Sequence, residues 1–520
     1  MMFSKPNVYL IGAGPGDPGL LTVKAVEVLK TADVVVYDYL ANKAFLDYRR
    51  PDAEVIYVGK KGGDHTLPQG EINKLLVARA REGKTVARLK GGDPYVFGRG
   101  AEEAEELLDA GLTFEVIPGV TSAVAAPAYA GIPITHRKFA SSVSFITGHE
   151  DPTKDESAHD WDALAKSGST LVFFMGVKNL PDISRRLIAG GRDPRTPAAL
   201  VRWGTTCRHR SMASTLEDIP RKAKEQGFKA PSLLVVGEVV GLRDKLNWFE
   251  KRPLLGKSVV VTRSREQASD LVRLLTDMGA CTLEFPTIEV APLPDTGGIR
   301  AAIGRLDAYD WLVFTSVNGV KYFWDALEAL GKDARALGTV EVAAIGPATA
   351  GALAGKGVKA DFVPDKYVAE SVVEGLLARG ARDKQVLLAR ASKARDVLPD
   401  ELRRAGAAVD VLPVYETRLA ARDAKEILEG ISEGEIHYLT FTSSSTVDNF
   451  FRMLPPERFA PVRDKVRIAC IGPITSGTLG KHGFTVDIEP KEYTIPALAQ
   501  AIAADDAAEA GSATDAGEGS

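Results

Sequence analysis

The chain contains little cysteine, and its cysteines are far apart. Its 520 residues include three of them, Cys207, Cys281 and Cys470. An odd number at these separations, with no Cys-x-x-Cys and no Cys/His ligand spacing, argues against disulfides and against a structural metal. We therefore expect three buried thiols and no metal ligands.

Long apolar runs and a strong charge of either sign are also missing. No apolar stretch approaches the about 18 residues of a membrane helix, and the amino terminus, Met-Met-Phe-Ser-Lys-Pro, lacks the apolar core of a signal peptide. A formal net charge of −4 gives no general attraction to nucleic acid. We expect a cytoplasmic protein that binds neither membranes nor nucleic acid.

What the sequence does contain is an alternation of strand-like and helical patterns, which predicts an α/β fold. A charged and aromatic segment at 243–252, followed by a new strand-like run at 257–262, places a domain boundary near residue 250. The last twenty residues carry five acids and no lysine or arginine, which predicts disorder. The expected parts are a first domain at 1–248, a linker at 249–255, a second domain at 256–500 and a disordered acidic tail at 501–520.

Three glycine-rich turns stand out in the first domain. They are Gly12-Ala-Gly-Pro-Gly-Asp-Pro-Gly19, Gly91-Gly-Asp-Pro94 and Pro118-Gly-Val-Thr-Ser122. Each follows an apolar, β-branched run, so each should lie at the carboxyl end of a strand, where α/β sheets bind ligands. The spacing is not Gly-x-Gly-x-x-Gly, and the prolines remove amide donors that phosphates would use. The turns therefore predict one pocket for a ligand other than a dinucleotide.

The second domain contains an internal repeat. The run Tyr309–Ser316 matches His437–Ser443, and Ile345-Gly-Pro-Ala-Thr349 matches Ile471-Gly-Pro-Ile-Thr475. The separations agree, since Phe314 to Gly346 is 32 residues and Phe441 to Gly472 is 31. A repeat of this length predicts two similar α/β lobes, at 256–287 plus 413–500 and at 288–412.

The motifs of the first domain resemble those of the uroporphyrinogen-III C-methyltransferases, in the tetrapyrrole methylase family, over residues 5 to 248. The resemblance implies a two-subdomain fold, a homodimer through this half, and transfer of two methyl groups from S-adenosylmethionine to uroporphyrinogen III, giving precorrin-2. It places the cofactor contacts on residues in and after the turns: Pro15, Gly91, Gly92, Asp93, Val96, Thr121, Ser122, Met175 and Gly204.

The same resemblance assigns proton transfer to Asp38 and Lys60, because methylation of a pyrrole carbon is followed by removal of a proton. Asp38 is otherwise interpreted as a helix cap after a strand. His65 and Arg99 are candidates for binding substrate carboxylates, and each is equally consistent with a role outside the site.

The second domain resembles the uroporphyrinogen-III synthase family over residues 255 to 500. The resemblance implies closure of hydroxymethylbilane to uroporphyrinogen III without a cofactor, with Tyr415 as the proton donor. The alternative for Tyr415 is packing at a lobe hinge. Hydroxyl and guanidinium groups at strand ends are expected to bind the carboxylates of the substrate: Arg263, Thr315, Ser316, Thr349, Arg390, Thr442, Ser443 and Thr475.

Together the two resemblances predict a bifunctional tetrapyrrole enzyme of the sirohaem and cobalamin branch, because the product of the second half is the substrate of the first. Two alternatives stay open. The first half could methylate another corrin precursor, or the second half could bind or regulate tetrapyrroles without turnover.

Overall fold

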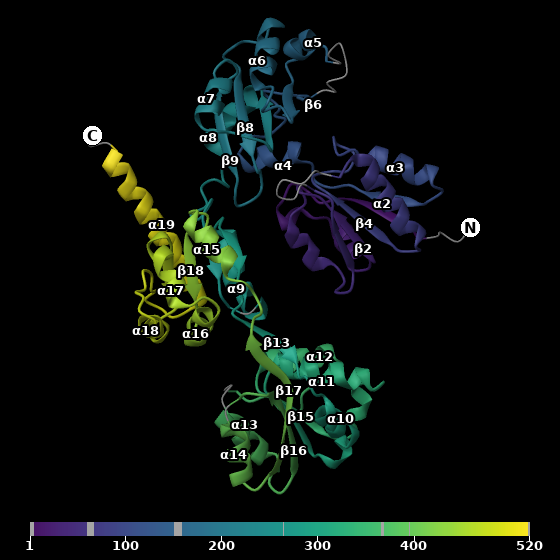
Figure 1. Cartoon of the computed structure of the whole chain (residues 1–520), viewed down its shortest axis with the longest axis vertical. Coiled ribbons are helices and arrows are strands. Elements are labelled where there is room, and N and C mark those ends of the chain that lie inside the picture. The colour runs from purple at the N-terminus through teal and green to yellow at the C-terminus, as the bar shows by residue number, and fades with distance from the viewer. Residues whose placement is uncertain are drawn as a thin grey trace. The chain divides into compact units, whose positions relative to one another are not determined.

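The computed structural model describes residues 5–59, 67–149, 159–263, 265–365, 369–394 and 396–517. It divides into two compact units, one of residues 1–259, 273–282 and 503–520, the other of 260–272 and 283–502. The described residues form four sheets, each with helices packed beside it (Figure 1). The predicted α/β class is confirmed. In the described part no helix is long and apolar enough to cross a membrane.

The first sheet is entirely parallel, in the order β3-β2-β4-β1-β5. Strand β2 shows why: Val34, Val35 and Val36 are all fully buried, and such continuous apolar strands suit a sheet covered on both faces. Its strands are β1 (Val8–Gly12), β2 (Val34–Tyr37), β3 (Glu54–Tyr57), β4 (Val86–Lys90) and β5 (Phe114–Ile117). Its helices are α1 (Val23–Leu29), α2 (Gln69–Arg81) and α3 (Gly100–Asp109), while α4 (Ser122–Tyr129) follows β5 but packs against the second sheet.

The second sheet is mixed, in the order β6-β7-β10-β8-β9. Only β6 and β7 pair in parallel, and the other three pairings are antiparallel. Its strands are β6 (Val143–Thr147), β7 (Thr170–Phe174), β8 (Pro197–Arg202), β9 (Arg210–Thr215) and β10 (Ser232–Val236). Helices α5 (Trp161–Lys166), α6 (Leu180–Ala189), α7 (Ile219–Glu225) and α8 (Arg243–Leu246) accompany it. The two sheets correspond to the two predicted subdomains of the first half.

The third sheet has the order β12-β11-β18-β19. Its core is rich in phenylalanine: Phe450, Phe451 and Phe459 are in mutual edge contact, and Phe441 makes an edge contact with Phe450. Its strands are β11 (Ser258–Val261), β12 (Cys281–Glu284), β18 (Tyr438–Phe441) and β19 (Arg467–Cys470). Its helices are α9 (Arg265–Asp277), α15 (Lys425–Ser432), α16 (Ser444–Met453), α17 (Pro456–Phe459), α18 (Pro473–Lys481) and α19 (Ile495–Gly517).

The fourth sheet, β13-β17-β16-β14-β15, is parallel except for the antiparallel pair β13 and β17. Its strands are β13 (Ile288–Pro292), β14 (Trp311–Phe314), β15 (Glu341–Ala344), β16 (Gln385–Ala391) and β17 (Ala408–Leu419). Its helices are α10 (Gly297–Gly304), α11 (Val317–Ala329), α12 (Pro347–Gly355), α13 (Ala369–Ala378) and α14 (Val397–Arg404). The predicted lobe boundary at 412/413 is wrong, because it falls inside β17, which pairs with β13 up to Leu419.

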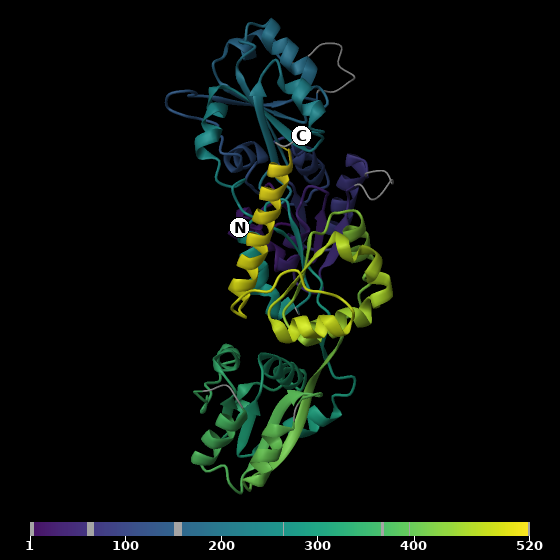
Figure 2. The same ribbon diagram turned by 90° about the vertical axis from the view of Figure 1, so that its left-hand side faces the viewer.

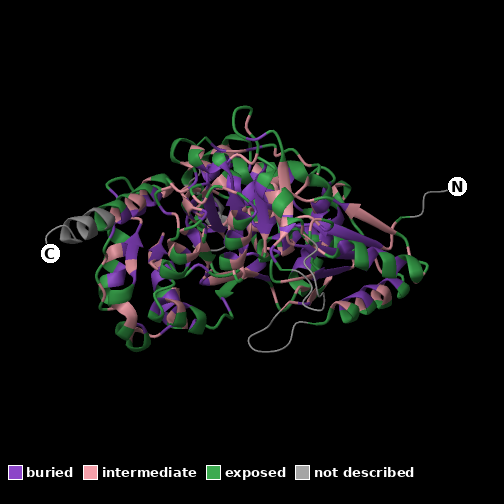
Figure 3. Cartoon of the chain, turned by 90° about the horizontal axis from the view of Figure 1, so that it is seen from above, coloured by how far each residue is buried: buried purple, intermediate pink, exposed green. Residues whose placement is uncertain are grey.

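The two segments matched in the sequence have the same order of elements. Strand β14, helix α11, strand β15 and helix α12 follow one another in one, and β18, α16, β19 and α18 in the other, with the short α17 before β19. In each, an aspartate accepts the N–H of the second strand at 2.7 Å, Asp361 that of Val342 and Asp487 that of Ile468. In Figure 3 many of the strands of the chain are drawn in the buried colour.

The predicted linker is folded onto the first unit, which is a correction to the sequence-based interpretation. Phe249 is buried against Tyr129, at 4.7 Å between ring centroids, and Arg252 lies over Phe249. The Glu250 carboxylate accepts hydrogen bonds from His209 and Arg243, among other donors. The charged and aromatic residues that suggested a linker are therefore satisfied by packing and by ion pairs.

The tail predicted to be disordered is helical in its described part. Helix α19, yellow in Figure 2, runs through it. Ile502 is fully buried, and the Asp506 carboxylate pairs with the Lys257 ammonium at 2.6 Å. The many alanines of this segment have a high helix propensity. The ion pair of Asp506 and the burial of Ile502 stabilise the helix further.

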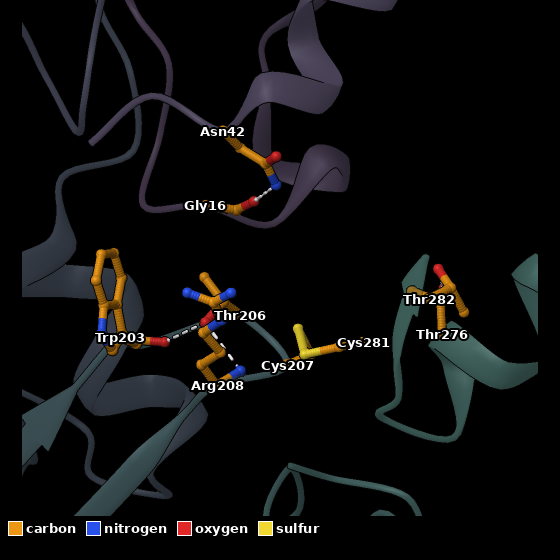
Figure 4. The surroundings of a disulfide bond; sticks show 9 residues. All are labelled: Gly16, Asn42, Trp203, Thr206, Cys207, Arg208, Thr276, Cys281 and Thr282. Atoms are coloured by element: carbon orange, nitrogen blue, oxygen red, sulfur yellow. Dashed lines mark hydrogen bonds between the residues drawn. A yellow bond between two sulfur atoms is a disulfide. The ribbon is translucent and has the colours of Figure 1, made fainter. Parts of the chain in front are cut away.

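Two of the three cysteines form a disulfide, Cys207–Cys281, so the expectation of three thiols is wrong for this pair and confirmed for buried Cys470 (Figure 4). Cys207 lies between β8 and β9, and Cys281 begins β12, 74 residues later. Backbone hydrogen bonds bring the two together, because Gly256 donates to Cys207 and Cys281 donates to Lys257, the residue after Gly256. No local sequence pattern reports a pairing made this way.

Candidate functional site

A cavity of about 890 Å³ opens in the first unit, at the carboxyl ends of β2 and β4. Its lining includes the loops after β1, β2, β4 and β5, together with residues of β7, β8 and β10. Strands of a parallel sheet direct their following loops to one edge, which is where such sheets hold ligands. The volume is within the usual range for small-molecule sites, about 300–1,000 Å³.

The three glycine-rich turns meet at this edge. Gly14 and Gly92 exchange backbone hydrogen bonds of 3.1 and 2.8 Å. A Cβ added to Gly12 would lie 2.4 Å from the Gly119 nitrogen, and one added to Gly119 would lie 2.4 Å from the Gly92 oxygen. Glycine is needed at these positions because the backbones of the three turns touch, so the turns form one rigid wall.

Eleven of the residues predicted for methyl transfer line this cavity. Lys60 and His65 fall outside the described residues. The eleven are Pro15, Asp38, Gly91, Gly92, Asp93, Val96, Arg99, Thr121, Ser122, Met175 and Gly204.

The backbone around the cavity is strained. Phe97, Arg99, Met175 and Trp203 all have φ between 49° and 59°, although none is glycine, and all four line the cavity. Only two other described non-glycine residues have positive φ, and one of them, Thr205, lies two residues beyond Trp203. Strain of this kind costs about 1–3 kcal/mol per residue and concentrates at functional sites.

Asp93 holds two of the turns together. Its Oδ1 accepts the Tyr95 N–H at 2.8 Å, and its Oδ2 accepts the Gly119 N–H at 3.1 Å. The carboxylate therefore stabilises the cavity wall as well as lining the cavity. Any bond from a ligand has to use the remaining lone pairs of the two oxygens.

Asp38 follows β2 and is not a helix cap. Its Oδ1 accepts the Leu40 N–H at 3.1 Å in the turn, and its Oδ2 pairs with Nη2 of Arg88 at 3.0 Å. The aspartate side chain is 28% exposed while that of Arg88 is 3% exposed. The buried guanidinium of Arg88 therefore orients the Asp38 carboxylate, which lines the cavity.

Arg99 lies at the exposed rim of the cavity. Its guanidinium makes two hydrogen bonds with the Glu102 carboxylate, of 2.9 and 2.7 Å. Hydrogen bonding to Glu102 raises the pKa of Arg99, so the side chain is a permanent positive charge at the entrance.

A buried cluster of charges below Asp38 received no role in the sequence analysis. Arg88 and Lys90, both on β4, donate to the same oxygen of Glu103 at 3.2 and 2.7 Å, and Gln69 donates to it at 3.1 Å. Glu103 is fully buried. The signal for this cluster was present, because two charged residues at alternate positions of an otherwise apolar strand face the same side.

In the second unit the structure brings Ser316 and Tyr415 together. The two side-chain oxygens are 3.1 Å apart. Ser316 Oγ also accepts the Gly319 N–H at 3.0 Å as the N-cap of α11, and Tyr322 stacks on the Tyr415 ring. Tyr415 is 8% exposed. The tyrosine hydroxyl is therefore held at the carboxyl end of β14.

The other candidates of this half lie at strand ends of two separate sheets or, for Thr349 and Thr475, in the first turns of helices α12 and α18, so the expected strand-end position is wrong for these two. Thr315 and Arg390 follow or end strands of the fourth sheet, and Arg390 pairs with Asp396 at 2.6 Å. Ser443 caps α16 in the third sheet, with its side chain accepting the Thr446 N–H. The remaining predicted positions are Thr349 in α12, Arg263 after β11, Thr442 after β18 and Thr475 in α18. Of the pairs among these candidates, Ser316 and Tyr415 show a direct contact between their side chains.

Comparison with known proteins identifies two families and several similar chains. Residues 7–220 match the family described as Tetrapyrrole (Corrin/Porphyrin) Methylases, and residues 269–500 match Uroporphyrinogen-III synthase HemD. The "Porphyrin biosynthesis protein HemD" of Ruminiclostridium josui is 38% identical over 93% of this chain and 95% of its own length. The "S-adenosyl-L-methionine-dependent uroporphyrinogen III methyltransferase" of Methanosarcina barkeri is 56% identical over 46% of this chain and 94% of its own.

A solved structure, uroporphyrin-III C-methyl transferase from Thermus thermophilus complexed with S-adenyl homocysteine, is 42% identical over 45% of this chain and 92% of its own, with a TM-score of 0.39. The relative from Ruminiclostridium josui matches nearly the whole chain. The chain therefore belongs to the tetrapyrrole methylase family in its first half and to the uroporphyrinogen-III synthase family in its second.

Proposed function

We propose that the protein is a bifunctional enzyme of tetrapyrrole biosynthesis. Its second half closes hydroxymethylbilane to uroporphyrinogen III, and its first half transfers two methyl groups to that product from S-adenosylmethionine, giving precorrin-2 for sirohaem or cobalamin. The observation that carries the proposal is the cavity of the first unit, because it collects the eleven described methyl-transfer candidates and is lined by four strained residues.

The lining of the cavity fits a nucleoside cofactor without phosphates. Val96, Met175 and Leu233 offer apolar contacts, and Thr121 and Ser122 offer hydroxyls where α4 begins. Proline at position 15 removes one amide donor of the kind that phosphate loops use. When bound, S-adenosylmethionine supplies an electrophilic methyl group.

The residues of the chain then have to orient the macrocycle and remove a proton. Asp38 is suited to accept that proton, because its carboxylate faces the cavity and Arg88 fixes its direction. Arg99 at the rim suits one of the eight carboxylates of the substrate. Lys60 remains a proposed partner in proton transfer.

In the second half we assign proton donation to Tyr415. Loss of the hydroxyl group of hydroxymethylbilane requires a donor, and the phenol is held against Ser316. Either oxygen can be the donor in this bond; when Ser316 donates, the phenol proton is free for the substrate. The threonines, serines and arginines at the strand ends bind carboxylates, and no cofactor is required.

The test is incubation of the purified protein with hydroxymethylbilane, with and without S-adenosylmethionine. Without the methyl donor we expect the type III isomer of uroporphyrinogen, and with it precorrin-2. Formation of the type I isomer alone, which arises by spontaneous closure, would show that the second half binds without turnover. Type III product that is never methylated would leave another corrin precursor as the substrate of the first half. We further propose a cytoplasmic location and a homodimer through the first half, which sedimentation of the isolated half would test.

A further inference from the structure

The buried charge cluster contains a lysine with unused donor capacity. Lys90 lies at the end of β4, lines the cavity, and its side chain is 5% exposed. An ammonium group has three N–H donors. Among the described residues, Glu103 is the single hydrogen-bond partner of this group, at 2.7 Å. A buried cation that borders a cavity with free donors is costly unless a ligand completes its bonds.

The cluster also fixes where in the cavity Lys90 acts. Arg88 bridges Glu103 to Asp38, so Lys90 and Asp38 are connected through three ion pairs. The pleat of β4 places Arg88 and Lys90 on the face that packs against α2 and α3, opposite to Leu89. Lys90 therefore lies on the side where the proposed proton transfer occurs.

The charges of the cluster sum to zero without a ligand, so an anion would be held by the free N–H donors of the Lys90 ammonium and not by an excess of positive charge. Arg88 and Lys90 carry two positive charges, which Glu103 and Asp38 balance. Burial, with the nearby charge of Arg88, lowers the pKa of Lys90. A bound carboxylate would favour the charged ammonium, and it would also favour the protonated form of Asp38. One anion at this position thus makes Asp38 a better proton acceptor during the reaction.

We propose that Lys90 contacts the tetrapyrrole directly and donates a hydrogen bond to one of its carboxylates. The proposal rests on the proposed function, and it adds to the rim residue Arg99 a second, buried contact below the macrocycle. Glu103 is then a positioning residue, because it holds the ammonium in place without reaching the cavity lining.

The experiment has to separate substrate binding from charge neutralisation inside the fold. Replacing Lys90 alone leaves the fully buried Glu103 with less compensation, which lowers stability for a trivial reason. The double variant Lys90→Gln/Glu103→Gln removes both charges and leaves two amides that can bond to each other. Glu103→Gln alone is the matched control.

We expect the double variant to bind S-adenosylhomocysteine within about twofold of the wild type in calorimetry. The KM for uroporphyrinogen III should rise about tenfold or more, as for the loss of a charged hydrogen-bond partner. Glu103→Gln should raise it by a smaller factor, because the amide oxygen can still accept a hydrogen bond from the ammonium and position it. A wild-type KM in the double variant would overturn the proposal, because Lys90 would then only neutralise Glu103. A matching loss of S-adenosylhomocysteine affinity would overturn it too, since the carboxylate would be that of the cofactor.

The variant Lys90→Met/Glu103→Gln repeats the test if the first double variant does not fold. Failure of the proposed function is a separate result, because wild-type protein would then not methylate uroporphyrinogen III at all.

Discussion

The Glu250 carboxylate holds the end of the first half in place, and we predict that Glu250→Gln makes this region less stable in a pH-dependent way. The carboxylate accepts hydrogen bonds from His209 at 2.9 Å and Asn247 at 2.7 Å, and from Ser211 and Arg243. Burial alone would raise its pKa, but these hydrogen bonds and the charge of Arg243 lower it from 4.5 to about 2.

The size of the effect follows from that shift. One pKa unit corresponds to about 1.4 kcal/mol, so the ionised Glu250 contributes at most about 3.5 kcal/mol. Its side chain is 19% exposed, so screening by solvent reduces this only modestly. Because the pKa is depressed in the folded state, the contribution is complete above pH 4.5 and is lost as the pH falls toward 2. By about pH 3.5 about 1.4 kcal/mol of it should be gone.

Hydrogen exchange read by mass spectrometry on peptides covering 243–255 measures the free energy of opening this segment. We expect the difference between wild type and Glu250→Gln to be largest near neutral pH and to shrink by about 1.4 kcal/mol at about pH 3.5. Glu217→Gln, at an exposed carboxylate of the same half, is the control and should show no such trend. A difference that does not change with pH would refute the reasoning.

Three further results are expected. Asp38→Asn should bind S-adenosylhomocysteine within about twofold of wild type in calorimetry and lose methyl transfer by about 100-fold or more, as for removal of a general base; unchanged methylation would exclude Asp38 as the base. Tyr415→Phe should lower formation of type III uroporphyrinogen while circular dichroism stays unchanged, and full turnover would exclude the phenol as donor. Peptide mapping without reductant should recover Cys207 linked to Cys281. Reduction should lower the free energy of unfolding by about 4 kcal/mol at most, as expected for a loop of 74 residues. Free thiols at both positions, or no loss of stability, would contradict the cross-link.

The strands were predictable because local patterns determine them. The runs around Val34–Val36 and Ser232–Val236 are apolar, β-branched and bounded by polar residues, and they are the observed β2 and β10. The packing of the segment at 243–252 was not predictable, because charged and aromatic residues occur both in linkers and in segments that pack on a domain. The segment packs only if partners such as Tyr129 and His209, at least 34 residues away in the sequence, lie near it in the fold.

The position of the cavity was predictable from the sequence, but the buried charges next to its lining were not. Glycine-rich turns after strands give its wall, and the family motifs name its lining from Pro15 to Gly204. The cluster of Arg88, Lys90 and Glu103 joins β4 to α3, and such pairings depend on how the helix packs on the sheet.

The strands β13 and β17 have one more consequence, for how this chain could be rearranged. The Ala420 N–H donates to the Thr287 carbonyl at 3.2 Å, directly beyond the pair Ile288 and Leu419. Residues 288–419 therefore leave and re-enter the third-sheet lobe at neighbouring points, as a guest segment does in a host protein. A short peptide joining 287 to 420 should close the host without reordering its strands, and the excised segment could be transplanted as one cassette.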